Sequence, residues 1–212
     1  MSIFDSFERK HDYLVCVDSD GCAMDTMNCK HFHCFGPCMV TEWGLEDWKD
    51  AILDRWNVIN LFSMTRGINR FKGLAMALGE IDKQYKLIPG IAALQHWADT
   101  APALSNDGVA KAAAEAIDPE AKAIIEKALS WSKAVNASIV ALPEELKVPY
   151  DGAREGLAAA HTFADVAMVS SATRDAVEEE WGKFGLLEHT AIVLAQDVGS
   201  KAHSIAEMLK FG

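Results

Sequence analysis

Residues 13–21 read Tyr-Leu-Val-Cys-Val-Asp-Ser-Asp-Gly, a continuous apolar run that ends in two acidic residues and a glycine. Such a run predicts a strand buried on both faces, as the strands of parallel sheets are. Acidic residues at the carboxyl end of such a strand lie where open α/β sheets have their active sites. Gly21 allows the backbone to turn sharply after them. The stretch therefore predicts an α/β fold with a functional site that begins at Asp18.

Two further apolar runs follow much later in the chain, and each is followed by a helical pattern. The first run covers 166–169 and the second covers 190–194. We expect helices after them over 173–184 and 201–209. The alternation of strands and helices predicts a parallel sheet domain, interrupted after its first strand by a large helical insert.

The long segment between the first two strands has helical periodicity. Asp118-Pro119 is a clear helix start, because Asp is a favoured cap and Pro suits the first helical position. The six tryptophans fall mostly at helical spacing among other apolar residues, which predicts that they belong to the core. We expect the sheet domain over residues 1–24 and 165–212, and the helical domain over residues 25–164.

Composition limits the partners of the chain. Its 212 residues include 20 Lys and Arg against 31 Asp and Glu, for a formal net charge of −11. This balance argues against nucleic acid and anionic membranes as partners, since both require basic surface. No run approaches the roughly 20 apolar residues of a membrane span, and residues 1–12 lack the apolar core of a secretory signal. We expect a cytoplasmic protein that binds neither nucleic acid nor membrane.

The five cysteines all fall within the first 40 residues. Without a secretory signal they are expected to be reduced thiols. Cys29, Cys34 and Cys38, with His31 and His33 between them, form a candidate metal cluster. Their spacing matches no common zinc pattern, so the packing of small apolar side chains is the favoured interpretation.

Asp18 and Asp20 can point into one pocket and do different work there, while the intervening Ser19 faces elsewhere. One carboxylate can attack an electrophile, and the other can protonate the leaving group. Because two close carboxylates repel each other, a hard cation such as Mg²⁺ commonly bridges one of them to a phosphate. Ser170, at the end of a neighbouring strand, and Lys201 would complete an anion site.

The run from Val15 to Thr26 resembles the first motif of the haloacid dehalogenase-like (HAD) hydrolase superfamily, in which an apolar strand precedes D-x-D-G and then D-T or D-S. The strand that ends at Ser170 looks like the second motif, and Gly199-Ser200-Lys201 looks like the third. The helical insert has the position of that family's cap domain. The resemblance implies a Rossmann-like parallel sheet core with a large α-helical cap.

The resemblance also implies a role for each site residue. Asp18 would be the nucleophile that forms an aspartyl-phosphate, and Asp20 would be the general acid and then the base. Asp18 and the backbone carbonyl of Asp20 would hold Mg²⁺. Ser170 would hydrogen-bond the phosphoryl oxygens, and Lys201 would neutralise charge beside Asp18. The acid at Asp20 favours phosphoryl transfer over dehalogenation, because the dehalogenase branch lacks it.

One part of the family pattern is not found. The superfamily has a fourth motif, a further strand ending in acidic residues, whereas only eleven residues follow Lys201 and their pattern predicts one helix. One hypothesis is that the chain is a fragment of a longer protein. Another is that Asp197 substitutes as the metal ligand. Without that strand the first strand would have an exposed apolar edge, which invites association into a homo-oligomer.

Substrate specificity is expected to come from the insert. Its most basic short stretch, residues 65–72, contains Arg66 and Arg70, and either could bind a substrate carboxylate or a second phosphate. A solvated charged face is an equally good interpretation of this stretch. Ser171 is a further candidate for substrate binding.

The expected function is Mg²⁺-dependent hydrolysis of a small phosphorylated metabolite, a phosphomonoester, through an aspartyl-phosphate. Two alternatives stay open. A phosphomutase would keep the same core and return the phosphate to the substrate. A non-catalytic ligand-binding or scaffold protein would follow if the fourth acidic motif is truly absent.

Overall fold

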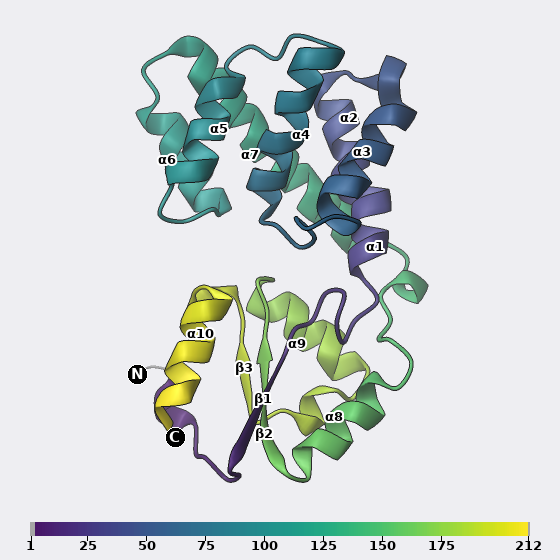
Figure 1. Cartoon of the computed structure of the whole chain (residues 1–212), viewed down its shortest axis with the longest axis vertical. Coiled ribbons are helices and arrows are strands. Elements are labelled where there is room, and N and C mark those ends of the chain that lie inside the picture. Colours follow the sequence, from purple (N-terminus) through teal and green to yellow (C-terminus); the bar gives the residue numbers. More distant parts are fainter. Residues whose placement is uncertain (1–2, 212) are drawn as a thin grey trace. The chain divides into compact units, whose positions relative to one another are not determined.

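The computed structural model of the chain describes residues 3–211. The chain divides into two compact units (Figure 1). The sheet unit comprises Met1–Met27 and Pro143–Gly212, and the helical unit comprises Asn28–Leu142. Residues 143–164 therefore lie with the sheet, whereas the sequence pattern grouped them with the helical insert.

The sheet unit contains a parallel sheet of three strands in the order β1-β2-β3. Strand β1 is Tyr13–Val17, β2 is Ala164–Val169 and β3 is Ile192–Leu194. Val17 is level with Met168 of β2, and Val169 is level with Leu194 of β3. The three predicted strands are confirmed, although β3 is shorter than the apolar run that predicted it. The prediction that the first strand is buried on both faces was wrong, because β1 is an edge strand whose Tyr13 and Cys16 are exposed.

Helices cover both faces of this sheet, as Figure 1 shows. Val166 and Met168 of β2 belong to a buried cluster that includes side chains of α8 (Ala153–His161) and α9 (Arg174–Lys183). Ala167 and Val169 face the other way, toward Met208 of α10 (Lys201–Met208). Every residue of β2 is buried, which is why this strand has no polar alternation in the sequence. The helices expected over 173–184 and 201–209 are confirmed as α9 and α10.

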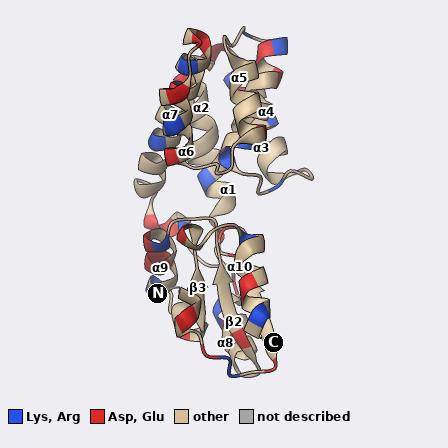
Figure 2. Cartoon of the chain, turned by 90° about the vertical axis from the view of Figure 1, so that its left-hand side faces the viewer, with Lys and Arg blue, Asp and Glu red and all other residues tan. Residues whose placement is uncertain are grey.

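Short helical turns precede, connect and follow the strands and helices of the sheet unit. They are 3-10 turns, and their bounds are Ile3–Ser6, Glu144–Leu146, Leu187–His189, Gln196–Val198 and Leu209–Phe211. Acidic residues gather on α9, whereas β3 carries no charge (Figure 2). The acidic residues here thus lie on α9, and β3 consists of apolar residues alone.

The helical unit packs its helices around aromatic side chains. Trp56 and Trp131 are fully buried, with ring centroids 6.1 Å apart. Of the six tryptophans only Trp48 is half-buried, so the core assignment is confirmed for the other five. The helices are α1 (Met27–Lys30), α2 (Gly36–Trp43), α3 (Lys49–Leu61), α4 (Arg70–Gln84), α5 (Ile91–Thr100), α6 (Asn106–Glu115) and α7 (Pro119–Val140), with a π turn at His31–Phe35 and a 3-10 turn at Glu46–Trp48.

Helix α7 starts as the sequence predicts. Asp118 accepts a hydrogen bond from the backbone N–H of Ala121 at 2.7 Å, and Pro119 is the first helical residue. Over residues 3–211, none of the helices has both the length and the apolar composition to cross a bilayer.

The segment before β1 is attached to β2 by the buried carboxylate of Asp165. Its Oδ2 accepts hydrogen bonds from the backbone N–H groups of Lys10 (3.0 Å) and His11 (3.1 Å), and its Oδ1 lies 3.2 Å from His11 Nδ1. Burial alone would raise the pKa of this carboxyl group. The hydrogen bonds outweigh burial, so its pKa lies below the ordinary value. The fold therefore stabilises the ionised form.

We expect Asp165→Asn to lower the free energy of unfolding by about 1–3 kcal/mol at neutral pH, and by less in acid. The sign follows from the lowered pKa. The stabilisation is present above the unfolded-state pKa of about 4 and is lost as the pH falls through the lower folded-state pKa. Urea unfolding between about pH 7 and pH 3 measures the effect. The control is Asp12→Asn, which changes an exposed carboxylate of the same segment. If stability depends on pH identically in wild type and Asp165→Asn, the ionised Asp165 does not stabilise the fold.

Candidate functional site

The candidate site is formed by the loops that follow the three strands. Because the strands are parallel, their carboxyl ends meet at the same edge of the sheet. The loop after β1 carries Asp18 and Asp20, the loop after β2 carries Ser170 and Ser171, and the loop after β3 leads to Lys201. One edge thus presents four of the residues that the sequence predicts to act together, with Ser171 beside them.

An ion pair at this edge joins Asp18 to Lys201. Lys201 Nζ lies 2.6 Å from Asp18 Oδ2, and Asp18 Oδ1 accepts the backbone N–H of Ser19 at 2.9 Å. The side chains of Lys201 and Asp18 are 41% and 37% exposed. The pair is therefore open to solvent, and a ligand could reach it.

The start of α10 determines where Lys201 lies. Ser200 caps the helix, with its Oγ accepting the backbone N–H of His203 at 3.1 Å, so Lys201 is the first helical residue. Gly199 precedes the cap with φ +130°, a conformation that side chains rarely permit, and a Cβ there would lie 3.1 Å from the His203 ring. The glycine thus allows the turn from β3 into the helix.

The loop after β1 folds back on itself and holds Asp20. Thr26, which is fully buried, donates a hydrogen bond from Oγ1 to Asp20 Oδ1. Gly21 has φ +76°, and its N–H donates to the carbonyl of Met24 at 2.8 Å. The second acidic residue is thereby fixed within the loop by a residue of the same motif.

Ser19 faces away from the two carboxylates, as expected. Its side chain is buried, and its Oγ accepts a hydrogen bond from Trp181 Nε1 of α9 at 2.9 Å. This bond attaches the loop after β1 to the helix that covers the sheet. The sequence gives no signal for it, because Ser19 and Trp181 are separated by most of the chain.

Ser170 and Ser171 differ in exposure. Ser170 is 3% exposed, its N–H donates to the Leu194 carbonyl at 2.9 Å, and its Oγ accepts the N–H of Ala172 at 3.1 Å. Ser171 is exposed. Since Asp18 follows Val17 and Ser170 follows β2, the two residues stand at the ends of adjacent parallel strands.

Asp197, the alternative metal ligand, is engaged by Arg174. Arg174 Nε donates to Asp197 Oδ2 at 2.8 Å and Nη2 donates to Oδ1 at 3.2 Å. The hydrogen bonds that Arg174 donates to Asp197, and after them the one that it donates to Glu178, raise the pKa of Arg174, although burial opposes this. Both oxygens of Asp197 thus accept from a cation, so this carboxylate is a poor candidate for a metal ligand.

The two arginines proposed for substrate binding lie in the helical unit and have partners there. Arg66 Nη1 donates to the Leu61 carbonyl at 3.1 Å. Arg70 Nη1 donates to Ser132 Oγ at 3.1 Å and Asn136 Oδ1 at 2.7 Å, which links α4 to α7. The guanidinium of Arg70 also lies 5.0 Å from the ring centre of Phe35. Arg70 therefore serves the packing of the helical unit.

Within 3–211 no group of three or more His, Cys, Asp or Glu side chains is arranged to hold a metal ion. All five cysteines lie within the described residues; none of them forms a disulfide, and Cys34 is the buried one among them. His31, from the candidate cysteine cluster, instead accepts a hydrogen bond from Trp56 Nε1 at 3.1 Å.

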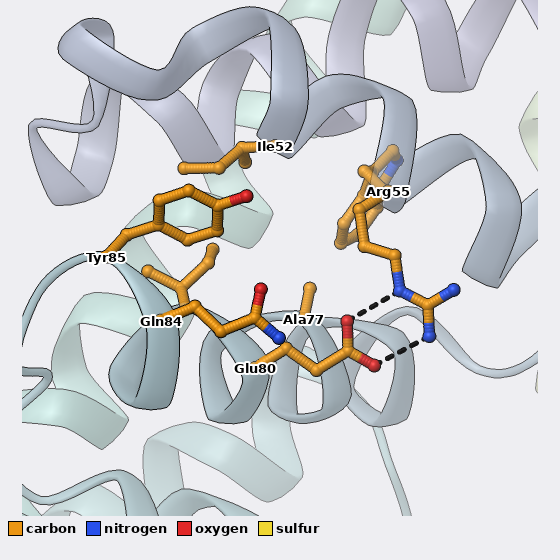
Figure 3. Close-up of a pocket in the computed structure, with 8 residues that line it drawn as sticks. Ile52, Arg55, Ala77, Glu80, Gln84 and Tyr85 are labelled. Carbon is orange, nitrogen blue, oxygen red and sulfur yellow. Dashed lines mark hydrogen bonds and ion pairs between the residues drawn. The ribbon is translucent and has the colours of Figure 1, made fainter.

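The helical unit contains a small cavity of about 130 Å³ between α3 and α4 (Figure 3). Trp56 and Ile81 contribute to its apolar lining, and Arg55 and Glu80 form a two-point ion pair at 2.6 and 2.7 Å beside it. The hydrogen bond between them raises the pKa of Arg55 and lowers that of Glu80. The two charges are engaged with each other, so the cavity suggests no class of ligand.

Comparisons of the chain with protein-family models, with curated proteins and with solved structures find no significant match.

We expect Ser19→Ala to lower the free energy of unfolding by about 1–3 kcal/mol, because Trp181 Nε1 would lose its partner in a buried position. Urea denaturation followed by tryptophan fluorescence measures the change. Ser171→Ala, an exposed serine at the same edge of the sheet, is the matched control. A Ser19→Ala protein as stable as this control would show that the bond contributes nothing.

Proposed function

We propose that the chain is a Mg²⁺-dependent phosphatase that hydrolyses a small phosphomonoester through an aspartyl-phosphate. The observation that carries the proposal is the Lys201–Asp18 contact of 2.6 Å at the carboxyl edge of a parallel sheet. Asp20 stands two residues beyond Asp18, and Ser170 ends the neighbouring strand. A nucleophile, an acid, a hydroxyl and a cation are the groups that phosphoryl transfer through a carboxylate requires.

In the first step an oxygen of Asp18 attacks phosphorus and the ester P–O bond breaks. The Asp20 carboxyl group gives its proton to the departing alkoxide, so the alcohol leaves neutral. Lys201 compensates negative charge beside the attacking oxygen, and the Ser170 hydroxyl can donate to a phosphoryl oxygen. The products of this step are the alcohol and an acyl phosphate on Asp18.

In the second step water attacks the same phosphorus atom. Asp20, now ionised, takes a proton from the water as the oxygen–phosphorus bond forms. The bond between phosphorus and the Asp18 oxygen then breaks, which releases inorganic phosphate and restores the carboxylate. Asp20 regains its proton, and both carboxyl groups return to their starting states.

The donor atoms at the site suit Mg²⁺, which prefers hard oxygen ligands and keeps several waters. One or two protein carboxylates together with a substrate phosphate satisfy it, so Asp18 and the backbone carbonyl of Asp20 are the proposed ligands. When bound, the ion would neutralise charge on the phosphoryl oxygens. The residues named above supply the attack and the proton transfers.

We further propose that the sheet unit is a HAD-like core and that the helical unit is its cap domain. The support is topological. The sheet is parallel with helices on both faces, and the helical unit is inserted between β1 and β2. A small phosphorylated metabolite is the proposed substrate, and the Lys201 ammonium group beside the nucleophile would attract its phosphate.

Asp18→Asn is expected to lower the rate of phosphate release by about 10³-fold or more, because an amide cannot attack phosphorus. The measurement is Mg²⁺-dependent release of phosphate from a panel of phosphomonoesters, with Asp175→Asn on α9 as the control. Equal turnover by Asp18→Asn and wild type would overturn the proposal. Unchanged ligand binding without turnover in either protein would instead favour the non-catalytic alternative.

Lys201→Met is expected to lower kcat by about 10²–10³-fold, the cost of removing one charge-stabilising donor from an active site. Steady-state kinetics at saturating Mg²⁺ measures it, with Lys210→Met of the same C-terminal segment as the control. A change of less than about threefold would mean that the ammonium group is not at the reacting centre.

A further inference from the structure

Arg174, the first residue of α9, joins three parts of the sheet unit. Besides the two bonds to Asp197, its Nη1 donates to Glu178 Oε1 at 3.0 Å and its Nη2 donates to the Val193 carbonyl at 3.2 Å. The side chain is 26% exposed, so most of it is buried. A planar guanidinium with two bonds to one carboxylate fixes direction as well as distance, which a single-point contact does not.

The carboxylate that Arg174 holds lies on the segment leading to Lys201. Asp197 belongs to the 3-10 turn Gln196–Val198, and Gly199 and the helix cap Ser200 follow it directly. The same turn is attached to the loop after β2, because the N–H of Gln196 donates to the Ala172 carbonyl at 2.9 Å. Arg174 therefore fixes the position from which α10 starts.

We infer that Arg174 is a positioning residue that, through Asp197, holds the first turn of α10 so that Lys201 reaches Asp18; the inference rests on the proposed function for its catalytic consequence. Arg174 touches neither the nucleophile nor the ammonium group. Its effect passes through the turn at Gln196–Val198. Removing the guanidinium would also leave Asp197 and Glu178, both acidic, without the cation that separates their charges.

A merely stabilising role would give a different result from a positioning role. Arg154 forms an ion pair with Glu188 at 3.6 Å in the same unit, and that pair involves neither the turn before α10 nor Asp18. Arg154→Met is therefore the matched control for Arg174→Met. Both changes remove a guanidinium from an ion pair, but only one of them frees the segment that carries Lys201.

The first readout does not require turnover. The full chain is treated briefly with a limiting amine-labelling reagent, and modification of Lys201 relative to Lys210 is measured by peptide mass spectrometry. Asp18→Asn sets the value for a released Lys201. We expect Arg174→Met to raise the labelling of Lys201 about two- to fivefold, the range that a partly exposed ion pair supports. Arg154→Met should give the wild-type value, and Arg174→Lys should fall between wild type and Arg174→Met.

The second readout is catalytic. We expect Arg174→Met to lower kcat about tenfold with little change in KM. The reason is that displacing the Lys201 ammonium group removes an interaction that stabilises mainly the transition state. Asp197→Asn should reproduce both effects, and it serves where Arg174→Met fails to fold. The double variant should be no worse than the more severe single variant, since both changes break one contact.

Wild-type labelling of Lys201 in both Arg174→Met and Asp197→Asn would overturn the inference, even if the protein is an active phosphatase. If Lys201 is labelled as fast in the wild type as in Asp18→Asn, the inference is overturned too, because Lys201 and Asp18 would then form no ion pair for Arg174 to position. Faster labelling in the variants of a protein that releases no phosphate would support the positioning role and reject the phosphatase. Faster labelling together with a lower kcat would support both.

Discussion

The parallel pairing of β1 with β2 is the constraint on which the rest of the sheet unit depends. Parallel neighbours require a long crossover, and here the crossover contains the whole helical unit. The pairing also places both carboxyl ends at one edge, which brings Asp18 beside the end of the strand that leads into Ser170. Register matters equally, since a shift of one residue would turn the buried side chains of β2 to the opposite faces.

Much of the secondary structure could be predicted from local pattern. The strands, α9, α10 and the start of α7 at Asp118 all depend on short-range signals such as apolar runs and caps. The placement of α8 could not be predicted, because its sequence is helical in either unit and only the packing of Leu157 against β2 assigns it to the sheet. The length of β3 could not be predicted for a similar reason. A strand extends only as far as it pairs with its neighbour, and β3 pairs with β2 over Ile192–Leu194.

Within the site, the predictable part is the set of residue types that follow each strand. The contact of Lys201 with Asp18 was implied only by resemblance, because spacing along the chain does not give the direction of a long side chain. The bonds that support it, Trp181 to Ser19 and Arg174 to Asp197, join distant segments, and no pattern in the sequence points to them. Arg70 is a further case, since it lies in a basic stretch that suggested a ligand and also links α4 to α7.

The balance of charge at this edge explains why a cation belongs in the proposed chemistry. Asp18 brings one carboxylate, since Asp20 enters the first step protonated. A phosphomonoester brings about −1.5 to −2 of charge at neutral pH, and Lys201 supplies one ammonium group in contact with the nucleophile. Arg174, the first residue of α9, is already occupied by Asp197 and Glu178. A phosphate approaching Asp18 would therefore meet repulsion that Lys201 offsets only in part. A divalent ion on the Asp18 oxygen would offset the rest, and this deficit of positive charge is an independent reason to expect the site to need one.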